Sequence, residues 1–171
     1  MMKTRRILGS LILLIIALPV LSFAQNEIER EISSLRGINE LGFTVNLETN
    51  VTLNEKGEIE VTSIKDAARQ RLAEAGIPLV SDREIESSAD IPFLYMHINT
   101  MDAGRGLVPF SVSIRFYQPV KLQLNRDRQT SASTWETGMV GIVSYDRMNI
   151  IQESAVNLLG DFINDFNSVN N

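Results

Sequence analysis

The sequence contains few residues that could do catalytic chemistry, and His97 is its only histidine. A single histidine excludes catalytic and metal sites that require two imidazoles. His97 falls in an alternating segment beside Tyr95 and Asn99, where a histidine is more often a surface or hydrogen-bonded residue than a catalyst. The chain has no cysteine and no Gly-x-Ser-x-Gly motif, which excludes thiol chemistry and the corresponding serine nucleophile.

Four carboxylates lie close together in the sequence, at Asp82, Glu84, Glu86 and Asp90. Alternating carboxylates can bind calcium, but this segment lacks the turn glycine and the terminal glutamate of an EF-hand loop. We therefore interpret it as a solvated acidic loop. Carboxylate pairs that could hydrolyse a glycosidic bond depend on a separation in space and cannot be recognised in a sequence.

Residues 103–106 (AGRG) are rich in glycine, but no Lys-Ser or Lys-Thr pair follows and no helix begins there. This context favours a turn over a phosphate-binding loop. The sequence thus predicts no catalytic residue, no metal site and no cofactor.

The clearest pattern is the alternation in residues 108–124, where the even positions from Val108 to Leu124 are apolar except at Gln118. One face of this strand is therefore packed and the other is largely wet, as antiparallel sheets allow. Arginine and aromatic side chains are favoured at interfaces. The candidate interaction surface on this sheet consists of Ser111, Ser113, Arg115, Tyr117 and Trp135.

Trp135 is the only tryptophan, and two interpretations of it stay open. If it faces the helices it belongs to the core. If it faces water beside Arg115 and Tyr117, it marks a recognition patch. The frequent burial of tryptophan favours the core.

The remaining elements follow from hydrophobic periodicity and turn residues. Helices are predicted over residues 26–35, 63–75 and 146–168. Strands are predicted over residues 41–47, 77–80, 93–100, 108–124 and 129–143. A turn at 54–57 could extend the first strand into a hairpin that returns at Ile59 and Val61. The order predicts an α+β fold with a mainly antiparallel sheet: a β-hairpin or strand, a helix, then a three-stranded meander, with two helices packed on one face.

Two prolines give the long strand a further feature. Pro109 and Pro119 are ten residues apart, so both missing N–H donors point to the same neighbour. We expect that edge to be unpaired or bulged at both places.

The amino-terminal residues 1–24 have the pattern of a cleavable signal peptide. Lys3 and two arginines precede an apolar run, and Ser22 and Ala24 occupy the positions that a signal peptidase requires. We therefore expect an exported protein, periplasmic or secreted, with one domain over residues 25–171 and no transmembrane segment after cleavage. Because there is no cysteine, we expect no lipoprotein anchor.

Without the first 24 residues the chain carries 13 basic and 21 acidic residues, a formal charge of −8. This acidic balance disfavours nucleic acid and anionic membrane surfaces as partners. It also favours solubility.

Several short motifs carry a resemblance that covers most of the exported part. They are Ala73–Ile77 after the second helix, Gln118–Val120, Ser133–Trp135 and Asp161–Phe166. With this order of elements, the chain resembles a group of small exported bacterial proteins of unassigned function. More loosely, it is similar to accessory domains of bacterial envelope assemblies, such as the amino-terminal domain of the Tol system's periplasmic protein. The resemblance implies a similar fold and compartment and carries no activity.

These observations favour a non-enzymatic periplasmic or secreted module that uses the wet sheet face and its proline-marked edge to bind a protein of the cell envelope. Two alternatives stay open: a carboxylate-dependent hydrolase with His97 as a helper, and an inhibitor of a secreted enzyme. The sequence does not predict an oligomeric state.

Overall fold

The computed structural model describes residues 26–50, 53, 59–125 and 127–170. The expected signal peptide, residues 1–24, and the expected turn at 54–57 lie outside the described residues. None of the described helices is both long and apolar enough to cross a membrane.

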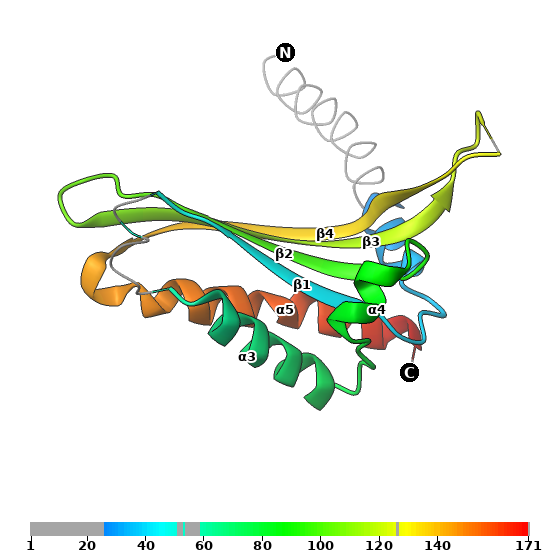
Figure 1. Ribbon diagram of the computed structural model, residues 1–171, viewed down its shortest axis with the longest axis horizontal. Helices are drawn as coiled ribbons and strands as arrows, with labels where there is room; N and C mark the ends of the chain where they lie inside the picture. The colour runs from blue at the N-terminus through cyan, green and yellow to red at the C-terminus, as the bar shows by residue number, and fades with distance from the viewer. Residues whose placement is uncertain (1–25, 51–52, 54–58, 126, 171) are drawn as a thin grey trace, which may run out of the picture.

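The described chain forms two layers, a four-stranded sheet and a pair of helices on one of its faces (Figure 1). The strands are β1 (Gly42–Glu48), β2 (Phe93–Thr100), β3 (Leu107–Lys121) and β4 (Gln129–Ser144). The covering helices are α3 (Val61–Glu74) and α5 (Asn149–Asn170), and the short helices are α4 (Asp82–Ser87) and the 3₁₀ helix η1 (Tyr145–Arg147). The predicted α+β class is confirmed.

The sheet is mixed, with the strand order β1-β2-β3-β4. β1 pairs with β2 in parallel, while β2, β3 and β4 form the predicted antiparallel meander. Parallel neighbours need a crossover connection, and here that connection contains α3 and α4. Both long helices therefore lie on the same side of the sheet, and the opposite side, which we call the open face, has neither of them (Figure 1).

The core lies between the sheet and the two long helices. β3 buries its even-numbered side chains from Val108 to Phe116, as the alternation predicts, and α5 buries a stripe at helical spacing that includes Ile151, Leu159 and Phe162. The ring of Phe162 is fully buried, with centroids 5.6 Å from Phe116 and 5.1 Å from Trp135. These aromatic contacts fasten α5 to the middle of the sheet.

The predicted hairpin is replaced by a single strand. Val61 begins α3 instead of a returning strand, because the helical spacing of buried Ile64, Ala68 and Leu72 continues backward to it. The partner of β1 is β2, which follows far along the chain. The predicted strand at 77–80 is reduced to one bridge, between Leu41 and Leu79.

The end of the predicted long strand is also different. β3 stops at Lys121, and Leu122 and Leu124 are 43% and 104% exposed. The end of β3 and the start of β4 project beyond α3 and α5, so these two helices do not cover this end of the sheet (Figure 1).

Pro109 and Pro119 flank the segment of β3 that pairs with β2, which runs from Phe110 to Tyr117. The carbonyl of Pro109 accepts from the N–H of Met101, directly after β2, so the proline-marked side faces β2. Both prolines therefore lie outside the ladder between β2 and β3, but this side is still hydrogen-bonded at the carbonyl of Pro109, so the predicted unpaired edge is not found there. The edge is not a free edge of the sheet, because β3 is an interior strand.

The irregularity in β3 pairing lies on its other side, toward β4. Phe116 pairs with Trp135 but Tyr117 pairs with Ser133, which leaves Thr134 as the extra residue of a bulge. Gln118 donates to the Thr134 hydroxyl (2.6 Å) and to the carbonyl of Ser34 (3.0 Å). The bulge therefore anchors the amino-terminal helix, residues 26–34, to the sheet.

A second clamp holds the end of this amino-terminal helix against α5. The side chain of Asn170 donates to the carbonyl of Leu35 (2.9 Å) and accepts from the N–H of Gly37 (2.8 Å). Gly37 has φ 77°, a conformation that favours glycine at a helix end.

We predict that Phe162→Ala lowers the free energy of unfolding by about 3–5 kcal/mol, because it leaves a cavity beneath Phe116 and Trp135. Urea denaturation followed by tryptophan fluorescence measures this directly. Asn164→Ala, an exposed position on the same helix, should change it by less than about 0.5 kcal/mol. Equal effects of the two substitutions would show that α5 is not held through Phe162.

Candidate functional site

The open face brings together four of the five residues predicted as an interaction surface. Ser111, Ser113, Arg115 and Tyr117 alternate with the buried residues of β3 and so share the side away from α3 and α5. Across β4 they meet Val140, Gly138, Glu136 and Ser133 in turn. These four residues share one face of the sheet, while their role in binding stays a prediction.

Trp135 is not part of this face. Its side chain is 3% exposed, it pairs with buried Phe116, and its indole N–H donates to Asp165 of α5 (2.9 Å). The bulge at Thr134 is the reason, because it changes which face the odd positions of β4 occupy. Ser133 therefore lies opposite Tyr117 on the open face and Trp135 lies in the core.

One end of the open face is aromatic and charged. Phe93 and Tyr117 stack with centroids 5.2 Å apart, and Tyr95 meets Tyr117 edge-on at 6.4 Å. Arg115 lies 3.2 Å from a carboxylate oxygen of Glu136. A hydrogen bond with Tyr117 and the charge of Glu136 raise the pKa of Arg115 further above its ordinary value, so this guanidinium stays charged.

His97 lies on the same face, in the row of β2 next to Tyr95, with hydrogen-bond partners at Nδ1. Nδ1 is 3.2 Å from the amide nitrogen of Asn46 and 3.2 Å from the Tyr95 hydroxyl. Nε2 is 3.7 Å from Glu48. An amide nitrogen can only donate, so Nδ1 accepts and the proton of the neutral ring resides on Nε2, facing Glu48. Nδ1 is therefore occupied by Asn46 and Tyr95, while Glu48 lies too far from Nε2 for a hydrogen bond.

The other end of the open face is apolar. Met101 is 54% exposed, Val140 83% and Ile142 68%. With Pro109 and Ser111 they line a shallow hollow of about 650 Å³. Sequence reasoning missed Val140 and Ile142, although residues 139–143 are apolar on both parities, which signals a strand with an apolar outer face.

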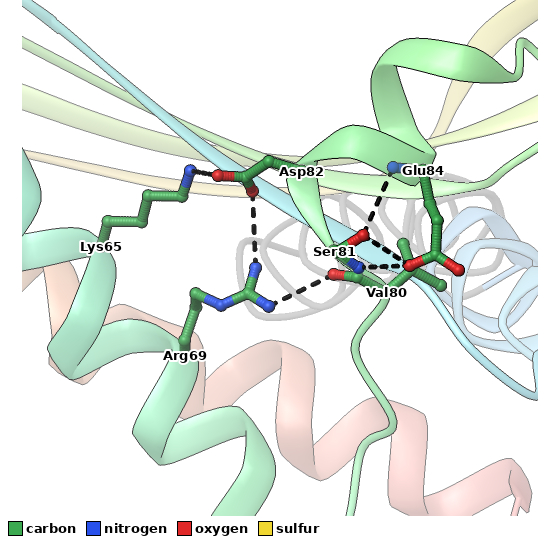
Figure 2. A network of polar contacts seen from close by, with 6 residues as sticks. All are labelled: Lys65, Arg69, Val80, Ser81, Asp82 and Glu84. Carbon is green, nitrogen blue, oxygen red and sulfur yellow. Dashed lines mark hydrogen bonds and ion pairs between the residues drawn. The ribbon is translucent and has the colours of Figure 1, made fainter.

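The acidic segment 82–90 has a structural role that its charge pattern did not indicate. Its first part forms α4, with a capping box in which Ser81 accepts from the N–H of Glu84 and Glu84 accepts from the N–H of Ser81 (Figure 2). The predicted loop is a helix over residues 82–87, although its carboxylates are exposed to solvent as predicted. The signal in the sequence was Ser-x-x-Glu, the capping-box pattern.

Asp82 ties α4 to α3. Its carboxylate lies 2.5 Å from Lys65 Nζ and 3.7 Å from Arg69, and Arg69 also donates to the Val80 carbonyl (Figure 2). The hydrogen bond from Lys65 lowers the pKa of Asp82. Asp82 and Glu84 are thus occupied by protein groups. The described residues contain no group of three or more histidine, aspartate and glutamate side chains that could hold a metal ion.

Acidic side chains also meet where the amino-terminal helix contacts β4 and α5. Glu31 and Trp135 line a cleft of about 510 Å³ at this junction. Burial and then the carboxylates of Glu136, Glu27 and Asp165 raise the pKa of Glu31. The helix is therefore held by the Gln118 and Asn170 contacts against a local electrostatic repulsion.

Comparisons with known proteins supply no family for this chain. No protein-family model matches it, and no curated protein does. The functional interpretation therefore depends on the geometry of the open face.

We predict that Glu31→Gln stabilises the protein at neutral pH by roughly 0.2–1 kcal/mol, the range of partly exposed charges. A raised carboxyl pKa contributes stability that is full below the ordinary value of 4.5 and is lost as the pH rises through the shifted value. The gain should therefore disappear below about pH 4. Urea midpoints of the wild type and variant across this range provide the measurement.

Glu29→Gln is the matched control, since Glu29 is an exposed carboxylate on the same helix. A gain for Glu31→Gln that persists at low pH, or no gain at pH 7, would contradict the repulsion at this junction.

Proposed function

We propose that the protein is a non-enzymatic binding module of the bacterial cell envelope, whose open face binds a protein partner. One observation carries the proposal. Within the part of the chain that the structure describes, both long helices lie on the other side of the sheet (Figure 1), and the open face exposes Met101, Val140 and Ile142 at one end and carries Arg115 and Tyr117 at the other.

The composition of this face fits an interface. Apolar surface in water costs about 25 cal/mol for each Å² that a partner could bury, so a contiguous exposed patch favours association. The Phe93–Tyr117 stack and the paired Arg115 supply a rigid aromatic and guanidinium anchor at the opposite end. A partner would therefore combine an apolar segment over Val140 and Ile142 with polar or acidic groups near Arg115.

The compartment belongs to the proposal as well. It is supported by the signal-peptide pattern of residues 1–24, the absence of cysteine and the acidic balance of residues 25–171. These features also support a released protein that carries no lipid anchor.

The hydrolase alternative gains no support from the site. His97 lies on the sheet surface with Nδ1 occupied by Asn46, and Asp82 and Glu84 are engaged by Lys65 and Ser81. An inhibitor of a secreted enzyme would be one form of the proposed binding module, distinguished by a one-to-one complex with loss of the enzyme's activity.

We predict that a photo-crosslinking amino acid at Ser111, in the middle of the open face, captures a discrete partner band in cells that produce the protein. The same probe at Glu153, exposed on α5 on the far side, should capture none. Val140→Ser with Ile142→Ser should reduce the Ser111 capture at least tenfold, since it removes the apolar patch while leaving the core intact.

Capture of the same proteins from Ser111 and Glu153, or capture that survives the double serine variant, would contradict binding by the open face. Purification of the partner then allows a direct binding measurement with the same variants.

A further inference from the structure

The two edge strands of the sheet are protected to different degrees. Beside β1, Ile85 of α4 packs so close to Gly42 that a Cβ there would lie 2.6 Å from it. Beside β4, the amino-terminal helix covers the part around the bulge, where Ser34 donates to the Thr134 carbonyl (3.2 Å). The segment Gly138–Ser144 pairs with β3 on one side and has no neighbouring strand on the other among the described residues.

The outward hydrogen-bonding groups of this segment can be assigned from its pairing with β3. The N–H of Tyr145 donates to the carbonyl of Gly106 (3.1 Å), so odd-numbered residues here direct their N–H groups toward β3. The N–H and carbonyl groups of Val140 and Ile142 therefore point away from the sheet. Both residues are also the most exposed apolar side chains of β4.

Natural edge strands are usually protected against pairing by lysine, proline or inward charges. β4 has none of these over its 16 residues, and Glu136 is its only charged residue. Between Glu136 and Asp146 lies an uncharged run, residues 137–145, whose middle residue is Gly141. A second copy that pairs antiparallel along this run meets no charge within it, and Glu136 comes opposite the partner's Asp146 only beyond the ends of the run, where Asp146 has left β4 for η1.

We propose that the protein forms a two-fold symmetric dimer by antiparallel pairing of β4 with β4 of a second copy, centred on Gly141. In this register the uncharged run lies against itself, and the outward groups of Val140 meet those of Ile142 of the partner subunit. The exposed side chains of both positions then form one apolar patch across the junction, and the two sheets become continuous.

The charge pattern favours a second copy over an unrelated strand. A copy of the same run offers matched apolar residues on both faces and no charge within residues 137–145. A single strand pair lies at the lower end of stable interfaces, which bury about 1,200–2,000 Å². The dimer should therefore be weak and should dissociate on dilution.

Cysteine crosslinking provides the test, because the chain contains no cysteine of its own. With a short bismaleimide, the full chain carrying Val140→Cys should give a product of twice the chain mass in the cells that produce it. Thr44→Cys, on the same face at the β1 edge, is the matched control and should give at least tenfold less of this product.

Proline variants separate strand pairing from other contacts. In the Val140→Cys background, Ile142→Pro removes an outward donor without breaking the pairing with β3 and should reduce the crosslinked dimer at least tenfold, whereas Ile142→Val should preserve it. Ser144→Pro is a second variant with an outward N–H, and the φ of −86° at Ser144 suits proline. Circular dichroism confirms that each variant is folded.

Equal crosslinking of Val140→Cys and Thr44→Cys, a dimer that resists both prolines, or no dimer at all would overturn the proposal. A crosslinked product with the mass of a different protein would also overturn it and would assign the edge to another chain. The proposal does not depend on the open face having a partner, since the Ser111 capture can succeed or fail independently.

Discussion

The packing of Phe162 against Phe116 and Trp135 is the interaction on which the rest of the structure depends. It fixes α5 beneath the centre of the sheet, and α5 in turn packs against α3 and, through Asn170, holds the amino-terminal helix. Because the crossover from β1 to β2 returns α3 to the same side, both long helices cover one face. The apolar faces of both long helices therefore cover one side of the sheet, and the open face remains exposed to solvent.

The bulge at Thr134 divides β4 into two parts with different surroundings. Before and around the bulge, Gln118 and Ser34 connect the strand to the amino-terminal helix, and Trp135 points inward. After it, the strand presents Val140 and Ile142 on the open face and an unpaired edge. One extra residue thus separates the part of β4 that builds the core from the part available to other chains.

Much of the fold could be predicted because its elements carry strong local periodicity. The alternation in β3 and the apolar stripe of α5 each indicate a buried face, and together they require a two-layer α+β arrangement. The parallel pairing of β1 with β2 could not be predicted, since the partner of a strand in a crossover is not marked by any local pattern. The burial of Trp135 agrees with the expectation from the frequent burial of tryptophan, but strand alternation could not show it, because its face depends on a bulge that shifts the parity of β4 by one.

The candidate site shows the same division. The solvent-exposed face of β3, with Arg115 and Tyr117, could be predicted from alternation alone. The apolar end of the open face could not, because its prediction requires the neighbours of Pro109 on β4 and in the segment after β2. The capping box at Ser81 could be recognised in the sequence, but the acidic residues after it favoured the interpretation of this segment as a loop.

The central claim is that the open face is bare in the isolated protein and occupied in the cell. Hydroxyl-radical footprinting of both samples by mass spectrometry tests it most directly. In the isolated protein we expect fast oxidation of Met101, which is 54% exposed, and protection of the buried Met96. In the cell, Met101 and Tyr117 should become protected while Leu124, at the projecting hairpin, stays reactive. Protection of Met101 in the isolated protein, or equal reactivity of Met101 in the two samples, would contradict the account.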